Sequence, residues 1–329
     1  MLKKEKKLSI ILISLISIIT FLSSCSKNKN YRKIAIIYEP VNSYYDNELK
    51  KDIINLKFNK NLNIKLYTNI ENNKEKILKN IEKENRGIVI LENRNLSLIK
   101  SIYKYCRHHK IILNLISNTT NSYFHNLFIT DYYKLGYQIG KELYNLSRKK
   151  RNIFIIFFQK NYKKIYYKNM LLKGFSQFNL EKNITLITNY YKKNINEETI
   201  HNSIKNWINE YGKELRGIFI DNDNIANISL NILRRSGKDN EIKIASFGTT
   251  LEGINSMLKI GLTVDADENR ISLFTNAIEY NITNKYKKYN KNRRKIIYIP
   301  GVIYNQQILL DKLAKTKKFS IKQLIDYEK

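Results

Sequence analysis

The sequence predicts an α/β fold of two similar halves, each with a parallel sheet covered by helices on both faces. Short continuous apolar runs alternate with segments in which apolar residues recur at helical spacing, as in sheets buried on both sides. The alternation begins near residue 33 and restarts after about residue 135. A chain of 329 residues, 43% of them hydrophobic, is long enough for two domains with large cores.

The first half is expected to contain strands at residues 34–38, 64–67, 87–91 and 111–115. Three apolar stripes, one between each pair of successive strands, predict helices. They are Tyr45, Leu49, Ile53 and Leu56, then Ile77, Leu78 and Ile81, then Leu98, Ile102, Tyr105 and Cys106.

The second half repeats this order, with strands expected at residues 153–158, 184–187, 217–220 and 242–247. Asp223 is expected to cap one helix, and Thr249 with Glu252 stands at capping-box spacing before another. Trp207 is expected to be a core residue. The helical stripes are Met170, Leu171, Phe175 and Phe178, then Ile200, Ile204, Trp207, Ile208 and Tyr211, then Ile225, Ile228 and Ile232, then Ile254 and Leu258.

The N-terminus has the pattern of an export signal. Four lysines lie within residues 1–7, residues 8–22 are apolar or carry hydroxyls, and Ser23-Ser24-Cys25 follows. Leu22-Ser23-Ser24-Cys25 resembles the lipobox of bacterial lipoproteins, so residues 1–24 are expected to be a signal peptide and Cys25 the acylated N-terminus, for example by palmitate. Residues 25–32 would then be a tether. An uncleaved anchor helix is the alternative, although the apolar run is short for one.

The formal net charge of +30 has two interpretations. It is typical of proteins that bind nucleic acid or anionic lipid. Compositional bias is the other, because Lys, Asn, Ile and Tyr are abundant and Pro and Gly number 2 and 11. The lysines are scattered along the chain, and this favours bias over a nucleic-acid partner.

The motifs of common enzyme classes are not found in the sequence. It has no Walker loop, no Gly-x-Gly-x-x-Gly after a strand and no His-Glu-x-x-His. Cys106 and His109 share a helix face, but two ligands do not make a closed metal site. We therefore expect no catalytic residues, no metal and no cofactor, and we expect Cys106 to be a buried, inert thiol.

The residues Val41 to Asn47, VNSYYDN, follow the first expected strand. Ligands of parallel sheets bind beyond the carboxyl ends of the strands, so Tyr44 and Tyr45 are candidates to face a cleft between the halves. Packing on the first half is the alternative for both rings.

Five segments in the same order resemble bacterial type I periplasmic binding proteins of the ribose/galactose class, from about Lys33 to about Leu310. They are Asn42-Ser-Tyr-Tyr45, Thr130-Asp131 with Gly136, Gly174-Phe175, Asp221-Asn222-Asp223-Asn224-Ile225-Ala226, and Ser246-Phe247-Gly248 through Gly253-Ile254.

The resemblance implies two Rossmann-like lobes joined by a three-segment hinge. The N-terminal lobe would comprise residues 33–131 and 266–299, and the C-terminal lobe residues 132–265 and 300–329. Asp131 and Pro300 would lie at the hinge. In such proteins, aromatic rings stack on a sugar face and polar groups bind its hydroxyls. The expected ligand-binding residues are Asn42, Tyr44, Tyr45, Ser117, Asn118, Asn222, Gly248 and Asp265.

Several charged positions of the sugar binders differ here. Ser117 and Asn118 stand after the fourth strand, Gly248 stands in place of an aspartate, and residues 169–173 lack the arginine that precedes Gly-Phe. Such charged contacts contribute much of the affinity in this class. Tyr190 or Tyr191 is a candidate for an aromatic wall in the second lobe, with core packing as the alternative.

The resemblance implies an exported, lipid-anchored, monomeric binding protein that captures a sugar-like solute and delivers it to an ABC permease. The alternative is a related lipoprotein that signals to a membrane receptor or has lost its ligand. A transcription regulator of the same fold would need a DNA-binding segment where this chain has its signal.

Overall fold

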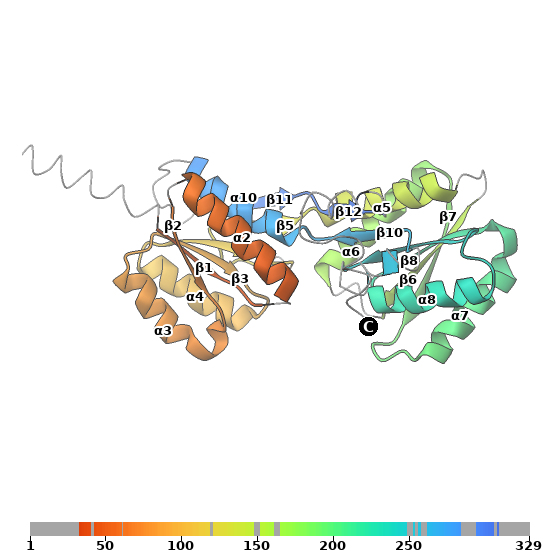
Figure 1. The fold of residues 1–329 in the computed structure, drawn as a ribbon, viewed down its shortest axis with the longest axis horizontal. Helices are drawn as coiled ribbons and strands as arrows, with labels where there is room; N and C mark the ends of the chain where they lie inside the picture. Colours follow the sequence, from red (N-terminus) through yellow and green to blue (C-terminus); the bar gives the residue numbers. More distant parts are fainter. Residues whose placement is uncertain are drawn as a thin grey trace, which may run out of the picture. The chain divides into compact units, whose positions relative to one another are not determined.

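The computed structural model describes residues 33–308 apart from 41–42, 61, 119–120, 148–151, 161–164, 249–252, 254–255, 258–261, 284–293 and 306–307. The chain divides into two compact units (Figure 1). Unit 1 comprises the chain up to Ile129 together with Ile271–Ile297, and unit 2 comprises Thr130–Arg270 and the chain from Tyr298. The chain therefore passes between the units three times, after Ile129, after Arg270 and after Ile297.

Unit 1 is built on a six-stranded sheet in the order β11-β5-β4-β3-β1-β2. The pairs of β1 with β2 and β3, and of β4 with β3 and β5, are parallel. Helices α3 and α4 cover one face, and α2 and α10 cover the other (Figure 1). The elements are β1 (Lys33–Ile37), α2 (Ser43–Lys60), β2 (Asn63–Tyr67), α3 (Ile70–Lys83), β3 (Ile88–Glu92), α4 (Leu96–His108), β4 (Ile112–Ile116), β5 (Asn126–Thr130), α10 (Arg270–Thr283) and β11 (Lys295–Ile299).

The unit 1 core follows from the apolar composition of its strands. Ile36 is fully buried and pairs in register with Leu66 and Ile90, and Phe128 of β5 is fully buried in register with Ile116 of β4. Cys106 on α4 is also fully buried, and burial raises the pKa of its thiol, so the expectation of an inert core cysteine is confirmed.

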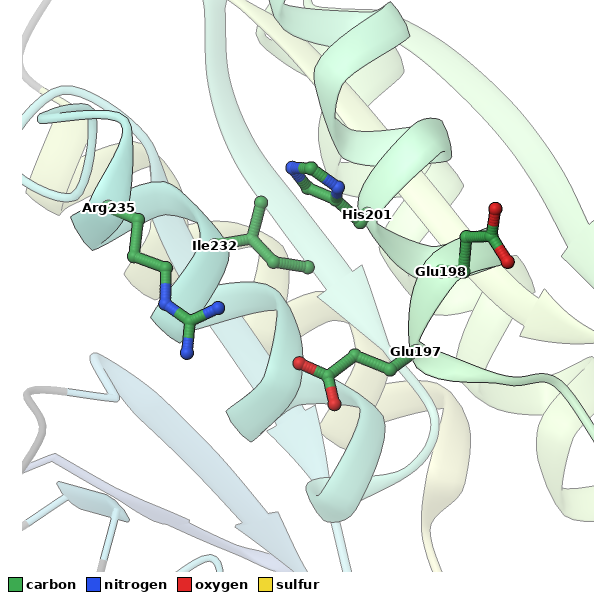
Figure 2. Close-up of a pocket in the computed structure, with 5 residues that line it drawn as sticks. All are labelled: Glu197, Glu198, His201, Ile232 and Arg235. Atoms are coloured by element: carbon green, nitrogen blue, oxygen red, sulfur yellow. The ribbon is translucent and has the colours of Figure 1, made fainter.

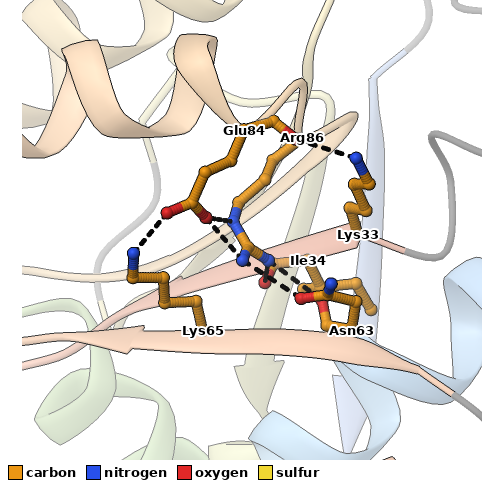
Figure 3. Close-up of polar contacts among 6 residues, drawn as sticks. All are labelled: Lys33, Ile34, Asn63, Lys65, Glu84 and Arg86. Carbon is orange, nitrogen blue, oxygen red and sulfur yellow. Dashed lines mark hydrogen bonds and ion pairs between the residues drawn. The ribbon is translucent and has the colours of Figure 1, made fainter.

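A buried arginine hydrogen-bonds to two strands at the amino edge of this sheet, where the strands begin. Arg86, 6% exposed, donates from Nη1 to the carbonyls of Ile34 and Asn63 at 2.8 and 2.9 Å, and its guanidinium pairs with Glu84 (Figure 3). Lys65 also pairs with Glu84, and Lys33 donates to the Glu84 carbonyl. Lys65 and Arg86 lower the pKa of Glu84, so this carboxylate is ionised at neutral pH.

Unit 2 has a second six-stranded sheet, in the order β12-β10-β9-β8-β6-β7. Its neighbouring pairs are parallel except β10–β12, which is antiparallel. Helix α5 packs on α6 and α7 packs on α8. The elements are α5 (Tyr132–Ser147), β6 (Ile153–Gln159), α6 (Tyr166–Glu181), β7 (Thr185–Tyr191), α7 (Glu197–Tyr211), the 3-10 turn η3 (Gly212–Glu214), β8 (Leu215–Ile220), α8 (Asp223–Arg235), β9 (Lys243–Phe247), β10 (Val264–Asp267) and β12 (Val302–Tyr304).

Two glycines allow α5 and α6 to cross in backbone contact. A Cβ added to Gly136 would lie 2.0 Å from the carbonyl oxygen of Leu171, and one added to Gly174 would lie 1.8 Å from that of Tyr133. These glycines belong to two of the five segments that carry the family resemblance. Their role here is helix packing, since any larger side chain would push the helices apart.

The unit 2 core contains the residues that the helical stripes predict. Trp207 is 6% exposed and packs edge-on to Phe157, with ring centroids 5.1 Å apart, so its prediction as a core residue is confirmed. Phe175 stacks on Phe219 at 5.3 Å.

Two features differ from the sequence expectations. The cap of α8 is Asn222 and not Asp223: Asn222 is extended (φ −154°, ψ 124°) and its Oδ1 accepts from the Ile225 N–H at 3.1 Å. Asp223 is the first helical residue and is buried. Strands β5, β10, β11 and β12 and helices α5 and α10 were not predicted from apolar patterning. Thr249 and Glu252 lie outside the described residues.

Within the described ranges, no helix has the length and apolarity needed to cross a bilayer. The expected signal residues 1–24, the tether and Cys25 all lie outside those ranges.

Candidate functional site

Asp221 is the centre of a polar cluster at the carboxyl edge of the unit 2 sheet. It follows β8 directly, and its side chain is fully buried. Two neighbouring strands end beside it: β6 ends at Gln159 and β7 at Tyr191. Parallel strands bring their carboxyl ends to one edge, so residues far apart in sequence meet here.

Three donors hold the Asp221 carboxylate. Lys168 of α6 lies with Nζ 2.5 Å from Oδ2, the Tyr191 hydroxyl donates a short hydrogen bond to Oδ1, and the Gln159 N–H donates to Oδ2 at 3.3 Å. The Lys168 side chain is 7% exposed. Burial, together with the carboxylate, raises the pKa of Tyr191, so its hydroxyl keeps the proton that it donates.

Aromatic rings lie close to this cluster within unit 2. Tyr167, at the start of α6, has its ring centroid 5.7 Å from that of Phe247 and 5.4 Å from that of Tyr132. Tyr167 also raises the pKa of Tyr191, as expected for a nearby phenol. A half-buried tyrosine beside a polar cluster offers a flat apolar face and a hydroxyl together.

The structure separates the two aromatic candidates that follow the second strand of this unit. Tyr191 is 6% exposed and packs on Phe157 at 4.9 Å, whereas Tyr190 is 48% exposed. Core packing therefore accounts for the ring of Tyr191, and its hydroxyl belongs to the Asp221 cluster. Tyr190 is the one of the pair whose ring reaches the surface of the unit.

Asn222 lies next to this cluster and is exposed. Its side-chain oxygen caps α8, so the amide nitrogen is the part left for a ligand. Its role as a ligand contact stays a prediction.

Gly248 lies against the buried carboxylate of Asp223, and Asp265 supplies a second buried carboxylate nearby. Gly248 has φ 153°, and a Cβ there would lie 2.9 Å from Oδ2 of Asp223. A Cβ on Gly253 would lie 2.7 Å from Asp223 Oδ2 and 2.8 Å from Asp265 Oδ2. Asp265 is fully buried and accepts from the Ser246 hydroxyl at 3.0 Å. An aspartate at position 248, as in the sugar binders, would be strained and would meet the Asp223 carboxylate.

The carboxyl edge of unit 1 also carries polar side chains. Ser117 and Asn118 follow β4 and are each 7% exposed. Beyond β1 and β3, Asn93 donates to Glu39 at 2.7 Å and its side-chain oxygen accepts from the Asn95 N–H at 2.7 Å. This edge therefore presents amides, a hydroxyl and a carboxylate.

The predicted residues after β1 are described in part. Asn42 lies outside the described residues. Tyr44 and Tyr45 lie in the first turn of α2, which begins at Ser43, and their side chains lie outside the described part. Their backbone positions follow the carboxyl end of β1, as expected, and what their rings face stays a prediction.

The two expected hinge residues lie beside positions where the chain passes between the units. The Asp131 N–H donates to the Ile299 carbonyl at 2.8 Å, and Asp131 Oδ1 accepts from the Lys134 N–H at the start of α5. The Pro300 carbonyl accepts from Asn269 at 3.3 Å. Gly301 follows, where an added Cβ would lie 2.9 Å from the Asp267 carbonyl oxygen.

A separate hollow of about 250 Å³ lies between α7 and α8 (Figure 2). Ile232 lies among charged side chains there, and the lining contains none of the predicted site residues. The lining residues are Glu197, Glu198, His201, Ile232 and Arg235. Within the part of the chain that the structure describes, no three His, Cys, Asp or Glu side chains group as a metal site requires.

The sequence did not single out Lys168 or Tyr167. Lys168 is one of many lysines in the chain, and the apolar stripe of its helix gives no reason to expect it to be buried. The available signal was the short spacing from Lys168 to Gly174, since the family carries a cation shortly before its Gly-Phe pair.

No known family profile matches the sequence, and no curated protein matches it. Solved structures do match. A sugar ABC transporter sugar-binding protein from Bacillus halodurans is 14% identical, with 84% of this chain and 98% of that chain covered and a TM-score of 0.66. A periplasmic ribose ABC transporter protein from Conexibacter woesei is 11% identical, with 86% and 94% covered and a TM-score of 0.66.

A third match is an ABC transporter periplasmic solute-binding protein from Actinobacillus succinogenes with bound D-allose. It is 14% identical, with 85% of this chain and 99% of that chain covered and a TM-score of 0.61. The chain therefore has the two-sheet α/β fold of type I periplasmic binding proteins, and the prediction of fold class is confirmed.

Proposed function

We propose that this chain is an exported, lipid-anchored solute-binding protein that captures a small, uncharged, sugar-like molecule and delivers it to an ABC importer. The two units would close on the solute by a hinge motion at Asp131 and Pro300. The chain would act by binding, as a monomer, without catalysis and without a cofactor.

The observation that carries the proposal is the polar and aromatic lining at the carboxyl edge of each sheet. In unit 1, Ser117 and Asn118 lie at this edge. In unit 2, Lys168, Tyr191 and Asp221 do. Ligands of open parallel sheets bind at such edges, and solved proteins of the same fold are described as sugar-binding.

The chemistry of the unit 2 edge favours a neutral solute. Asp221 is already neutralised by Lys168, so the pair adds no net charge to the site. A sugar has apolar C–H faces and a rim of hydroxyls, which tyrosine rings and amides can cover and bind. An anion or a cation would find no buried counter-charge in this pair.

Tyr167 is the residue that we propose as the aromatic contact from unit 2, and Tyr44 and Tyr45 are those that we propose from unit 1. Asn222 would donate from its amide nitrogen, because its oxygen caps α8. Asn42, Gly248 and Asp265 complete the proposed set. Asp265 would support the site without touching the solute, because it is buried and accepts a hydrogen bond from Ser246.

A thermal-shift screen of the chain starting at Ser26 tests the capture of a solute. Every described element lies after residue 32, so this chain retains both sheets. Neutral sugars, polyols, nucleosides and furanoses should be screened, with acidic sugars as the matched set. A ligand at a hundred times its dissociation constant adds about 2.7 kcal/mol of stability. Stabilisation by acidic sugars in preference to neutral ones would overturn the proposed solute class.

Acylation of Cys25 needs its own test. Labelled palmitate should be incorporated into the full chain in bacterial cells and lost in the Cys25→Ser variant. Equal labelling of both would contradict the anchor and leave the solute screen unaffected.

A second candidate function has one observation in its favour. The described polar groups at the unit 2 edge already partner one another: Asp221 with Lys168 and Tyr191, and Asp265 with Ser246. A lipoprotein that signals through protein contacts, or that has lost its ligand, would keep such closed networks. A negative solute screen, combined with capture of a membrane receptor and no permease, would favour this function.

A further inference from the structure

Unit 1 has a basic edge that lies at the point where the chain enters from its N-terminal segment. We define the basic edge by six side chains. They lie at the ends of helices, at the starts of strands or in the turns between them, at the amino edge of the unit 1 sheet: Lys33, Lys83, Arg107, Lys110, Arg294 and Lys295. Lys83 ends α3, Arg107 is in the last turn of α4, and Lys33 and Lys295 begin β1 and β11.

Backbone contacts bring these segments to one edge. The Ile112 N–H donates to the Gly87 carbonyl at 3.0 Å, which joins the turns that follow α3 and α4. The Lys295 N–H donates to the His125 carbonyl at 3.0 Å, which places the start of β11 beside the start of β5. Lys33 Nζ donates to the carbonyl of Glu84 at 3.1 Å, so it reaches the turn after α3 (Figure 3).

The carboxylates at this edge are already engaged by other groups. Glu84 pairs with Lys65 and with the buried Arg86, as Figure 3 shows. Glu82 lies 3.6 Å from the His109 ring and accepts from Tyr105. Lys65 and Arg86 offset the charge of Glu84, which leaves Glu82 as one exposed carboxylate beside four exposed members of the basic edge: Lys83, Lys110, Arg294 and Lys295.

The opposite edge of the same sheet has the reverse charge. Glu39, Glu71 and Glu92 lie at or just beyond the carboxyl ends of β1, β2 and β3, and the described cations there include Arg94 and, at the start of α10, Arg270. A uniform compositional bias would add lysines to both edges alike. Helix ends favour cations at their C-termini, which accounts for Lys83 and Arg107. It does not account for Lys33, Lys110, Arg294 or Lys295, which lie outside helices.

We propose that the basic edge of unit 1 docks on an anionic lipid surface, so that the carboxyl edge of the sheet points away from the membrane. This inference rests on the proposed anchoring at Cys25. Cys25 and Lys33 are eight positions apart, with seven residues between them. This stretch spans about 28 Å when fully extended and about 16 Å as a flexible coil. A tether of this length allows the basic edge to approach the membrane surface, where salt leaves charges unscreened over about 8–10 Å.

Anionic vesicles test this directly, with the chain that starts at Ser26 so that acyl insertion plays no part. Binding to vesicles of phosphatidylglycerol and phosphatidylcholine should exceed binding to phosphatidylcholine alone and should fall as salt rises. In the edge variant, Lys83→Gln, Lys110→Asn, Arg294→Gln and Lys295→Gln remove four exposed charges. Each contacting cation is worth about a fivefold change in partitioning, so the variant should bind at least about tenfold more weakly.

The matched control removes four exposed charges from unit 2 by changing Lys173, Lys192, Lys205 and Lys213 to Gln. It has the same net charge as the edge variant and should keep nearly all vesicle binding. Both variants should unfold at the temperature of the unchanged chain, which shows that the fold is retained.

Three results would overturn the proposal: no preference for anionic vesicles, equal losses in both variants, or equal retention in both. Binding of heparin or an oligonucleotide as tightly as the vesicles, with the same dependence on the basic edge, would assign the surface to a soluble polyanion and also overturn it. None of these results bears on solute capture or on Cys25 acylation, which have separate assays.

Discussion

Lys168 of α6 and Asp221 after β8 form a buried ion pair, with Nζ 2.5 Å from Oδ2 and side-chain exposures of 7% and 0%. Residues 53 positions apart in the sequence are thus joined at the carboxyl edge of unit 2. Two charges removed from water are tolerated because Tyr191 and the Gln159 N–H also donate to the carboxylate. The pair makes this edge polar without giving it net charge.

Breaking the ion pair should be costly to stability. Asp221→Asn leaves the Lys168 ammonium buried beside a neutral amide and should lower the free energy of unfolding by about 3–5 kcal/mol. Denaturant unfolding measures this change. The exposed Lys173→Met on the same helix is the control and should change stability by less than about 0.5 kcal/mol. The double variant Lys168→Met/Asp221→Asn should regain part of the loss; further loss would show that the charges do not act as a pair.

Gly174 should not tolerate a side chain. Its Cβ would lie 1.8 Å from the Tyr133 carbonyl oxygen, so Gly174→Ala must shift α5 from α6. Overpacking of this kind costs about 1–3 kcal/mol, and thermal or denaturant unfolding will show it. Lys173→Ala, one position earlier and exposed, is the control. A Gly174→Ala chain as stable as the unchanged one would contradict the close helix crossing.

His125 should make stability depend on pH. It is 6% exposed, and its Nδ1 accepts from the Leu113 N–H at 3.0 Å, which needs the neutral ring. Burial, together with Arg107 and Arg294, lowers the pKa of His125 to about 4 from an ordinary value of 6.5. Between these pH values the unfolded chain binds more protons, so stability falls as pH drops from about 6.5 to about 4.

The size of this effect is up to about 3 kcal/mol. Unfolding of the unchanged chain and of His125→Asn, whose side-chain oxygen can accept the same hydrogen bond, should be compared across this range. The variant should lose less stability on acidification. Parallel curves for the two chains would show that His125 is not the titrating group.

Asn222 should serve both the helix and the ligand, and two substitutions separate these roles. Asn222→Ala removes the cap of α8 and should cost about 1 kcal/mol of stability as well as affinity for the solute. Asn222→Ser keeps an oxygen that can cap the helix, so stability should remain while affinity falls. Retained affinity in the Ser variant would remove Asn222 from the ligand contacts.

The sequence predicted the alternating core of both units because their strands are buried on both faces and read as apolar runs. Strand β10 escaped prediction because Val264–Asp267 alternates apolar residues with two aspartates, one of them fully buried. Strand β11 was not predicted for a different reason. Its sequence, KIIYI, is largely exposed, so the strand is recognised by its pairing in the sheet and not by its burial. Neither feature is visible without the fold.

The residues of the candidate site could be predicted where they lie together in one sequence segment, and could not be predicted where distant segments bring them together. The run Asp221-Asn222-Asp223 drew attention as a motif, but three adjacent polar residues do not reveal which one caps the helix. Lys168 could not be assigned, because its burial depends on Asp221, which follows β8 and lies 53 positions away in the sequence. Residues 42, 44 and 45 stay predictions, carried by their position after β1.

The most direct test of the account is calorimetric titration of the chain starting at Ser26 with the best neutral sugar or polyol from the screen. The account predicts saturable binding of one molecule per chain, lost when Tyr44 and Tyr45 are both changed to alanine and kept when exposed Tyr133 is changed to alanine. Binding that survives the loss of both rings, or saturation at a site unaffected by Tyr167→Ala and Asn222→Ala as well, would contradict it.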